Sequence, residues 1–452
     1  MTDKNIKVRF PPSPTGEWHF GNIRTFVFNY LFAKKNGGEI VMRFEDTDIA
    51  RNKPGSDILQ LELLKKMGMD FDEGPYYQSQ RKDIYKNELQ RLIDNGTAYE
   101  AEENQAGTGK LIRIKNPKKD IVWNDLIKGE ITIASDSFKD EKGNFDFIIA
   151  RSINDPLYHF TVVVDDWLMG ITHVLRGEDH VTSTPRQMVI FEALGAPVPL
   201  FGHLPTILSS ENKKKLGKRN GAIPVREYLD QTYLPDAILN MISLLGWNPG
   251  GDQEIFTRKE LIEKFSLEKV QKSPAIFNAS KLDWLNKEHM KLLGDEVFAK
   301  EIKDRLSKRF TNESIIEKLI PSIKERIVKW LDIDTMLEAG EFDFAFKSPS
   351  FDKQMLICDE RMRKGTEVTD ETVSNHLKNI VTKLETIPEE KFDAETVKTT
   401  LWDYATENGR GIVLWAMRIA LSGREKSPDP FQISAIIGKT ETTVRLTNAS
   451  KL

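Results

Sequence analysis

The chain has 452 residues, 39% hydrophobic content, a formal net charge of −4 and a single cysteine. This length allows several hydrophobic cores, so we expect a multidomain protein of about three domains. The charge balance excludes a surface coated uniformly in positive charge, so a polyanionic partner would have to meet local basic patches. The lone Cys358 excludes an internal disulfide and a multi-cysteine zinc site, which agrees with a reducing compartment.

Targeting and membrane signals are missing from the sequence. The first residues, Met1–Val8, carry charge but lack the apolar stretch of a signal peptide. No window approaches the ~20 uninterrupted apolar residues of a membrane span. We therefore expect a cytoplasmic protein without a membrane partner.

The first elements in the chain are a strand, a loop and a helix. Apolar residues alternate from Ile6 to Phe10, which is typical of a strand, and recur on one face from Ile23 to Leu31, which is typical of a helix. The loop between them carries His19 and Gly21. Backbone N–H groups at a helix start attract phosphate, and glycine lets a bulky group approach closely, so the junction predicts a nucleotide site. The alternative is a proline-stiffened turn with an exposed histidine.

A second strand is predicted from Glu39 to Phe44. Strand, helix and strand make a parallel unit, in which ligands gather at the carboxyl ends of the strands. We therefore expect Arg9 and Glu45 to border one crevice. From Pro54 to Gly96 helical signals dominate, interrupted at Phe71–Pro75.

Residues 97–150 differ in pattern from the segments on either side. Short alternating runs punctuated by glycines predict a β-rich insertion between two halves of a sheet. The parallel pattern then resumes with predicted strands at Tyr158–Asp166, Ile171–Arg176 and Phe201–Leu208. A basic loop follows, with five Lys or Arg residues against one acid between Glu211 and Arg219.

Helical spacing dominates from Val225 to the end of the chain. From about residue 296 the pattern is almost wholly helical, and we expect four prolines to interrupt it: Pro321, Pro388, Pro428 and Pro430. Between Lys300 and Lys329 there are nine basic residues against five acids. This face either follows a phosphate backbone or is an ordinary solvated helix surface.

Two loops in this order resemble the signatures of a class I aminoacyl-tRNA synthetase. His19–Gly21 resembles the ATP-binding signature, with Asn22 where a second histidine usually stands, and Lys215–Arg219 resembles the phosphate-loop signature. The closer similarity is to the glutamyl-tRNA synthetase family. Three further stretches reproduce motifs of that family: Arg9–Gly16, Arg43–Asp48 and Arg176–His180. The likeness runs in order through about residue 295 and continues more weakly to the end.

The resemblance implies a fold and a domain order. It predicts an α/β Rossmann-type catalytic domain with a parallel sheet and an inserted acceptor-binding domain, followed by all-α C-terminal anticodon-binding domains. The expected segments are 1–96 (first catalytic half), 97–157 (inserted connective domain), 158–225 (second catalytic half with the phosphate loop), 226–295 (helical stem-contact domain) and 296–452 (helical anticodon-binding region of two subdomains).

The resemblance also implies two adjoining substrate sites. The catalytic residues are expected to be His19, Gly21, Lys215 and Lys218, and the ATP-binding residues His19, Gly21, Asp179 and Lys218. The glutamate-binding residues are expected to be Arg9, Ser13, Glu45, Tyr158 and Arg176.

Elementary chemistry agrees with these roles. Activation joins the α-carboxylate of the amino acid to the α-phosphorus of ATP, so the site must neutralise charge and hold the reactants in line. Lys218 on its loop would stabilise the leaving pyrophosphate, with Lys215 in support. The planar fork of Arg9 suits the side-chain carboxylate of glutamate, and Glu45 suits the ammonium.

Internal ion pairs are an alternative explanation for these charged residues. Glu45 and Arg43 could simply pair at a strand end, and Arg176 could pair with Glu178 or Asp179.

The implied reaction is ATP-dependent activation of L-glutamate to glutamyl-adenylate and its transfer to the 3′ end of tRNA(Glu), with release of AMP and pyrophosphate. ATP brings its own Mg²⁺, and a monomer is the family expectation. Some relatives carry a zinc knuckle in the inserted domain just after the segment that corresponds to residues 96–99, but no cysteine occurs there, so we expect no zinc or other resident metal.

Two alternative functions are glutamylation of a modified tRNA base and RNA binding by a catalytically inactive relative. The base-modifying enzyme resembles the catalytic half alone, so the long segment after Asn286 speaks against it. His19 and Lys218 speak against an inactive protein.

Besides Asn22, two positions depart from the family pattern. Gly217 stands where serine is usual, which removes a hydroxyl from the phosphate loop and adds backbone freedom. Pro11 stands where alanine is common, and it has no N–H to donate to a ligand.

Overall fold

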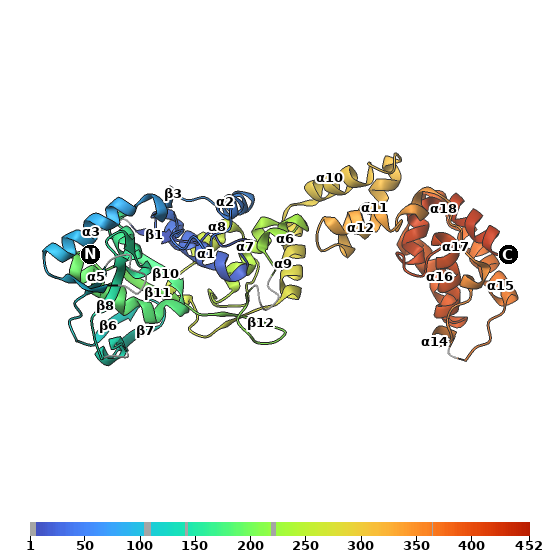
Figure 1. The fold of residues 1–452 in the computed structure, drawn as a ribbon. Coiled ribbons are helices and arrows are strands. Elements are labelled where there is room, and N and C mark those ends of the chain that lie inside the picture. The colour runs from blue at the N-terminus through green and yellow to red at the C-terminus, as the bar shows by residue number, and fades with distance from the viewer. Residues whose placement is uncertain (1–5, 104–109, 141–142, 218–222, 364) are drawn as a thin grey trace. The chain divides into compact units, whose positions relative to one another are not determined.

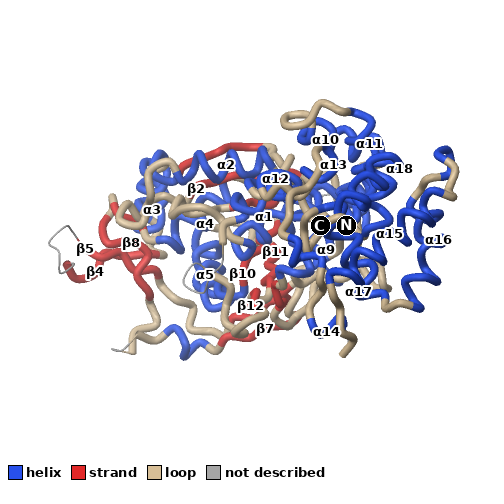
Figure 2. Tube along the Cα trace, turned by 90° about the vertical axis from the view of Figure 1, so that its right-hand side faces the viewer, coloured by secondary structure: helices blue, strands red, loops and turns tan. Residues whose placement is uncertain are grey.

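The computed structural model describes residues 6–103, 110–140, 143–217, 223–363 and 365–452. The chain divides into two compact units, Met1–His289 and Met290–Leu452 (Figure 1). Every strand of the described chain belongs to the N-terminal unit, and the C-terminal unit consists of helices and loops (Figure 2). In these described ranges, no helix is both long and apolar enough to cross a bilayer.

The N-terminal unit begins with alternating strands and helices. These are β1 (Lys7–Phe10), α1 (Phe20–Lys35), β2 (Glu39–Phe44), α2 (Ser56–Lys66), β3 (Glu73–Tyr77) and α3 (Lys82–Asp94). Strand β2 pairs in parallel with β1 on one side and β3 on the other. The predicted first strand, first helix and second strand are therefore confirmed, and β3 forms where only an interruption of helices was expected.

The next segment is rich in strands, as predicted. Its strands are β4 (Ala98–Glu103), β5 (Lys110–Ile114), β6 (Ile121–Asp125), β7 (Gly129–Ile133), β8 (Phe147–Ser152) and β9 (Asp155–Pro156). Strands β4, β5, β8 and β9 form an antiparallel sheet in that order, and β6 and β7 form a separate hairpin.

The parallel sheet then resumes. Its next elements are α4 (Tyr158–Leu168), β10 (His173–Gly177), α5 (Thr184–Leu194) and β11 (Leu200–Leu204), with β10 and β11 parallel. The N–H of Thr172, next to β10, donates to the carbonyl of Lys7 at 2.9 Å, which sets β10 beside β1. The resulting order is β3-β2-β1-β10-β11. From β1 the chain adds β2 and β3 on one side of the sheet and later β10 and β11 on the other, so the strand order switches between β1 and β10. Parallel sheets bind ligands at such a switch point, outside the carboxyl ends of the strands.

The predicted strand at Tyr158–Asp166 is wrong, because these residues form helix α4. Phe160 through Asp166 are all buried, and the helix packs against α3, α5 and β8. A short apolar run that is buried on every side has no periodicity to distinguish strand from helix, and packing overrides the β-preference of its valines.

The predicted strand at Phe201–Leu208 is divided in two. Strand β11 ends at Leu204, and after Pro205 and Thr206 a separate strand, β12 (Ile207–Ser209), pairs with β13 (Ala275–Phe277) instead. The remaining helices of this part of the chain are α6 (Val225–Asp230), α7 (Pro235–Leu244), α8 (Arg258–Lys264) and α9 (Ala279–Leu292).

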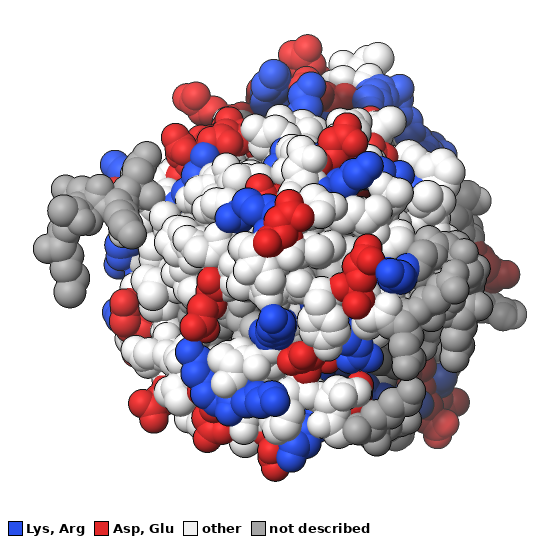
Figure 3. Space-filling model, turned by 60° about the vertical axis from the view of Figure 1, so that its left-hand side comes forward, with Lys and Arg blue, Asp and Glu red and all other residues white. Residues whose placement is uncertain are grey.

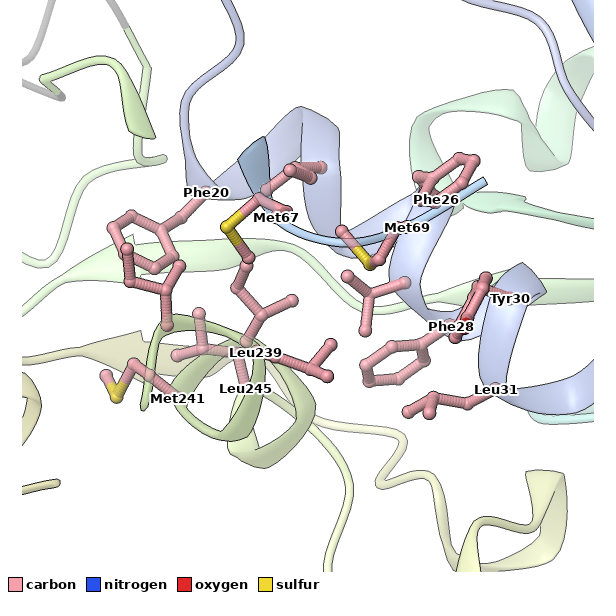
Figure 4. Packing of buried hydrophobic residues seen from close by; sticks show 14 of the residues in the cluster. Phe20, Phe26, Phe28, Tyr30, Leu31, Met67, Met69, Leu239, Met241 and Leu245 are labelled. Carbon is pink, nitrogen blue, oxygen red and sulfur yellow. The ribbon is translucent and has the colours of Figure 1, made fainter. Parts of the chain in front are cut away.

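Helix α1 lies in the main core of the N-terminal unit. Its side chains meet those of α7 and of the segment after α2, where Met67 and Met69 lie (Figure 4). Phe28 of α1 also contacts Phe265 edge to face at 5.2 Å between ring centroids. This packing holds the helix, and with it the loop at its N-terminus, in a fixed place beside the sheet.

The C-terminal unit is helical, as predicted. Its helices are α10 (Asp295–Leu306), α11 (Glu313–Arg326), α12 (Leu331–Glu338), α13 (Asp343–Phe346), α14 (Glu360–Arg363), α15 (Asp370–Glu385), α16 (Ala394–Glu407), α17 (Arg410–Ser422) and α18 (Pro430–Ala449). Pro388 and Pro428 lie between helices and Pro430 begins one, but Pro321 lies inside α11, so its predicted interruption is wrong.

The basic residues between Lys300 and Lys329 form several ion pairs within this unit. Lys303 pairs with Glu317 at 2.7 Å and Arg309 with Asp343 at 2.8 Å. Arg326 pairs with Glu341. These pairs favour an ordinary solvated helix surface. On the face of the molecule drawn in Figure 3, acidic and basic side chains are likewise interspersed.

A buried carboxylate, Asp165 of α4, joins four neighbouring side chains. It accepts hydrogen bonds from Arg81 at 2.7 Å, Tyr85 at 2.8 Å and Gln78 at 2.9 Å, and lies 3.6 Å from Arg43. Its side chain is 0% exposed. Asp165 is therefore the countercharge of Arg81 and a second, more distant countercharge of Arg43.

We predict that Asp165→Asn lowers the free energy of unfolding of the N-terminal unit by about 3–5 kcal/mol, because it removes the charge that buried cations require. Urea unfolding followed by tryptophan fluorescence measures this. The control Asp136→Asn removes an exposed ion pair with Lys139 and should cost less than ~1 kcal/mol. Equal effects of the two substitutions on the free energy of unfolding would contradict the role of Asp165 as a buried countercharge.

Candidate functional site

A cavity of about 820 Å³ opens at the carboxyl ends of β1 and β10. Six of the predicted site residues line it: Ser13, His19, Gly21, Arg176, Asp179 and Lys215. Arg9, Glu45 and Tyr158 do not line the cavity. All three interact electrostatically with Arg176, which lines the cavity and is also one of the predicted glutamate-binding residues. Lys218 lies outside the described residues.

His19 is the N-cap of α1. Its Nδ1 accepts a hydrogen bond from the N–H of Gly21 at 3.0 Å, and its own N–H donates to the Asn22 side chain at 3.3 Å. One N–H expected to face a phosphate is therefore used by the histidine itself. Asn22, where the family usually has a second histidine, completes the cap. An accepting Nδ1 puts the proton of neutral His19 on Nε2.

Gly21 is required by the close approach of the His19 ring. A Cβ at this position would lie 2.8 Å from Cε1 and 3.0 Å from Nδ1 of the imidazole. Any side chain here would push the ring away from the helix N-terminus. The glycine is thus needed for the cap as well as for space beside a ligand.

The phosphate loop is fixed where it meets this cavity. The N–H of Leu216 donates to Ile207 of β12 at 2.7 Å, and the Leu216 side chain is buried. The Nζ of the preceding Lys215 lies 3.3 Å from Asp179 Oδ2. Both side chains are more than half exposed, so this ion pair contributes little to stability and its partners can rearrange around a ligand.

A charge cluster, made of Arg9, Arg43, Glu45, Asp166 and Arg176, adjoins the cavity through Arg176. Asp166 joins two of the arginines, with Oδ1 2.8 Å from Arg43 Nη1 and Oδ2 3.3 Å from Arg9 Nε. Burial works to raise the pKa of Asp166, but Arg9 and Arg43 hold it below its usual value. The cluster contains three cations and two acids, and Asp165, 3.6 Å from Arg43, adds a third acid next to it.

Several buried polar atoms of this cluster lack a hydrogen-bond partner among the described residues. They include Nη1 of Arg9, Nη1 of Arg176 and Oε1 of Glu45. Buried polar groups are rarely left unpaired, because each one costs about 1–3 kcal/mol. Two guanidinium donors and one carboxylate acceptor are thus suited to a ligand that carries both an anionic and a cationic group.

Glu45 and Tyr158 have strongly shifted pKa values. Burial raises the pKa of Glu45 to about 7 despite the opposing charges of Arg43 and Arg9. The pKa of Tyr158 is also raised, by desolvation and by the charge of Glu45, although 38% of the residue remains exposed. A cation beside Glu45 would restore its ionised form.

The two internal pairings have different outcomes. Glu45 Oε1 lies 3.5 Å from Arg43 Nη2, an ion-pair distance without a hydrogen bond, and Arg43 pairs more closely with Asp166. Arg176 pairs with neither Glu178 nor Asp179 among the contacts of the described residues. Its Nε donates to His203 at 3.2 Å and its Nη2 to Thr184 at 2.8 Å.

Sequence reasoning missed Asp166 and His203 as members of this site. Two adjacent aspartates that end an apolar run were a usable signal for Asp166. On a strand they would point to opposite faces, whereas on a helix both can reach the arginines of the sheet. His203 gave no local signal, because its partner Asp125 is 78 residues away in the sequence.

Comparison with known proteins agrees with the fold. Residues 5–107 and 100–284 match the catalytic domain of class I tRNA synthetases (E and Q), and residues 297–450 match an anticodon-binding domain. A glutamate–tRNA ligase of Carboxydothermus hydrogenoformans is 36% identical, over 98% of this chain and 99% of the relative. One from Bacillus subtilis is 34% identical, over 98% and 99%.

A solved structure is similar over the full length. The crystal structure of a glutamate tRNA ligase from Elizabethkingia meningosepticum in complex with its amino acid has a TM-score of 0.81 and 30% identity, and covers 99% of both chains. The catalytic sheet and its matching domain define a class I aminoacyl-tRNA synthetase. With relatives matched over nearly their full length, the chain belongs to the glutamate–tRNA ligase family.

We predict that the stability difference between wild type and Glu45→Gln depends on pH. Between about pH 4.5 and 7 the folded protein keeps a proton on Glu45 that the unfolded chain has lost, so this stabilisation is complete below pH 4.5 and is lost as the pH rises through 7. Relative to the variant, wild type should lose about 3 kcal/mol across this window.

Urea unfolding at a series of pH values measures this difference. Glu62→Gln, at an exposed position of α2, serves as the control for removing a carboxylate. A difference that is constant with pH would contradict the raised pKa.

Proposed function

We propose that this chain activates L-glutamate with ATP and transfers the glutamyl group to the 3′ end of tRNA(Glu), releasing AMP and pyrophosphate. One observation carries the proposal: a capped helix N-terminus at His19 and a charge cluster with unpaired buried atoms adjoin one cavity. The full-length relatives named glutamate–tRNA ligases support the choice of amino acid.

Glutamate would bind at the charge cluster. The unpaired Nη1 atoms of Arg9 and Arg176 would hold its side-chain carboxylate, since guanidinium groups bind carboxylates in charge-assisted hydrogen bonds. Oε1 of Glu45 would accept from the ammonium. Tyr158 would provide a wall and a hydroxyl, and Ser13 would contact the amino acid from the cavity side.

ATP would bind along the cavity beside α1. His19 and Gly21 would contact phosphate and adenosine, and Asp179 the ribose or adenine. Lys215 and Lys218 would neutralise the pyrophosphate, with Mg²⁺ carried in by ATP. Pro11 donates no N–H here, and Gly217 leaves the phosphate contacts to lysines and backbone.

The chemical step would need no protein nucleophile. An oxygen of the glutamate α-carboxylate forms a bond to the α-phosphorus, the bond from that phosphorus to the bridging oxygen breaks, and pyrophosphate leaves with the bonding electrons. The protein aligns the two anions and offsets their charge. The terminal ribose hydroxyl of tRNA then attacks the activated carbonyl, and AMP leaves.

The domains would share the tRNA between them. Residues 97–157 would hold the acceptor end of the tRNA, residues 226–295 would contact its stem, and residues 296–452 would bind its anticodon. Segments 1–96 and 158–225 would carry out the reaction. The protein would act as a monomer in the cytoplasm. Glutamylation of a modified base is disfavoured, because the anticodon-domain match covers residues 297–450. An inactive relative is disfavoured by the retained His19 cap.

The test is ATP–pyrophosphate exchange with glutamate, with and without tRNA(Glu). We expect glutamate-dependent exchange that appears or rises strongly when tRNA is added, and charged tRNA as product. Glutamine and aspartate in place of glutamate are the controls for the amino acid. If the protein with its cognate tRNA gave no exchange and no charged tRNA, the proposal would be refuted.

We further predict that Arg9→Lys raises the KM for glutamate about 10- to 100-fold, with a smaller effect on the KM for ATP, because lysine keeps the charge beside Asp166 but loses the fork. The matched control is Arg258→Lys, since Arg258 is a partly buried arginine bonded to Asp236 and to the carbonyls of Met67 and Gly68. An unchanged KM for glutamate in Arg9→Lys would remove Arg9 from the pocket.

A further inference from the structure

A buried chain of three side chains connects the β6–β7 hairpin to the charge cluster. Asp125 Oδ2 lies 2.5 Å from His203 Nδ1, and His203 Nε2 lies 3.2 Å from Arg176 Nε. The side chains of Asp125 and His203 are 0% exposed, and Arg176 is 5% exposed. Asp125 ends β6, while His203 and Arg176 are register partners on β11 and β10.

The geometry fixes the tautomer of His203. The Nε of arginine is always a donor, so in its contact with Arg176 the Nε2 of His203 accepts and carries no proton, and the Thr184 hydroxyl, 3.1 Å from Nε2, can donate to it as well. The proton of the neutral ring then lies on Nδ1 and is donated to Asp125. In agreement, burial lowers the pKa of His203, and although burial works to raise the pKa of Asp125, hydrogen bonds from His203 and from the Lys128 N–H hold it at about 2.

Asp125 is itself held firmly. Its Oδ1 accepts from the N–H groups of Lys128 at 2.9 Å, Ile127 at 3.0 Å and His203 at 3.1 Å. The N–H of Leu126 donates to the carbonyl of Phe201 at 2.8 Å. The hairpin turn is thereby fastened to β11.

The same hairpin turn also reaches the other side of Gly177. Lys128 Nζ lies 2.5 Å from Glu178 Oε2, and Glu178 Oε1 accepts from the N–H of Thr206 at 2.6 Å. Arg176 and Glu178, the residues on each side of Gly177, are therefore both tied to one turn of the hairpin.

We propose that Asp125 and His203 are positioning residues for glutamate, which aim the unpaired Nη1 of Arg176 at the amino acid through the fixed tautomer of His203. The inference rests on the proposed function and deepens it. The β6–β7 hairpin contributes no lining residue to the cavity. It nevertheless sets the position of Arg176, and through Arg176 it affects the affinity for glutamate.

The decisive variant is Asp125→Asn. An asparagine oxygen can still accept from the three backbone N–H groups, but its NH₂ faces His203 Nδ1. The ring must then carry its proton on Nε2, where it opposes the Nε–H of Arg176. The Nε2 proton can then go only to the Thr184 hydroxyl, which also accepts from Arg176 Nη2, so Arg176 loses its hydrogen bond from Nε to His203 and its guanidinium is no longer held in place there.

We expect Asp125→Asn to raise the KM for glutamate by roughly 10- to 100-fold, measured at saturating tRNA, while the KM for ATP changes less than about twofold. The matched control is Asp146→Asn, because Asp146 also lies outside the parallel sheet and caps a backbone N–H, that of Asn116 at 2.9 Å. It should leave both KM values unchanged.

A purely structural role would instead lower turnover or change both KM values equally, and either result would overturn the proposal. The tautomer is tested independently of activity, by ¹⁵N chemical shifts of labelled histidine in the full-length protein, with His203 assigned from the spectrum of His203→Gln. Wild type should carry the proton on Nδ1, and a proton on Nε2 would also overturn the proposal. Wild type without glutamate-dependent exchange would refute the proposed function, while the shifts still test the tautomer.

Discussion

The site depends on a cluster of buried charges whose internal pairing is incomplete. Asp166 neutralises Arg43 and Arg9 together, so one carboxylate serves two guanidinium groups, while burial keeps Glu45 partly protonated near neutral pH. Burying such groups costs several kcal/mol each unless they are paired. The fold accepts this cost at the switch point of the sheet, where a charged ligand would complete the pairing.

The rest of the N-terminal unit holds this cluster in place. Helix α1 packs in the main core, which fixes the His19 cap at the cavity, and α4 brings Asp165 and Asp166 to the arginines of the sheet. The β6–β7 hairpin reaches Arg176 through His203. Elements far apart in the sequence thus converge on a few guanidinium groups, and each supplies either a countercharge or a hydrogen bond.

The sequence predicted those parts of this arrangement whose signals are local. The strand ending at Phe10 and the helix from Phe20 each have a clear apolar period, and the strand ending at Phe44 is a short apolar run that follows two glycines. Their order predicted that Arg9 and Glu45 would lie near one another, although neither lines the cavity. Helix α4 was predicted as a strand, because a fully buried run lacks that period. Asp125 and His203 could not be paired from sequence, since their contact depends on tertiary folding alone.

The central claim is that the unpaired atoms of the charge cluster are the contacts for glutamate. A crystal structure of this protein with L-glutamate bound tests it most directly. We expect the side-chain carboxylate within hydrogen-bond distance of Nη1 of Arg9 and Arg176, and the ammonium against Oε1 of Glu45. Glutamate bound elsewhere, with these atoms still unpaired, would contradict it.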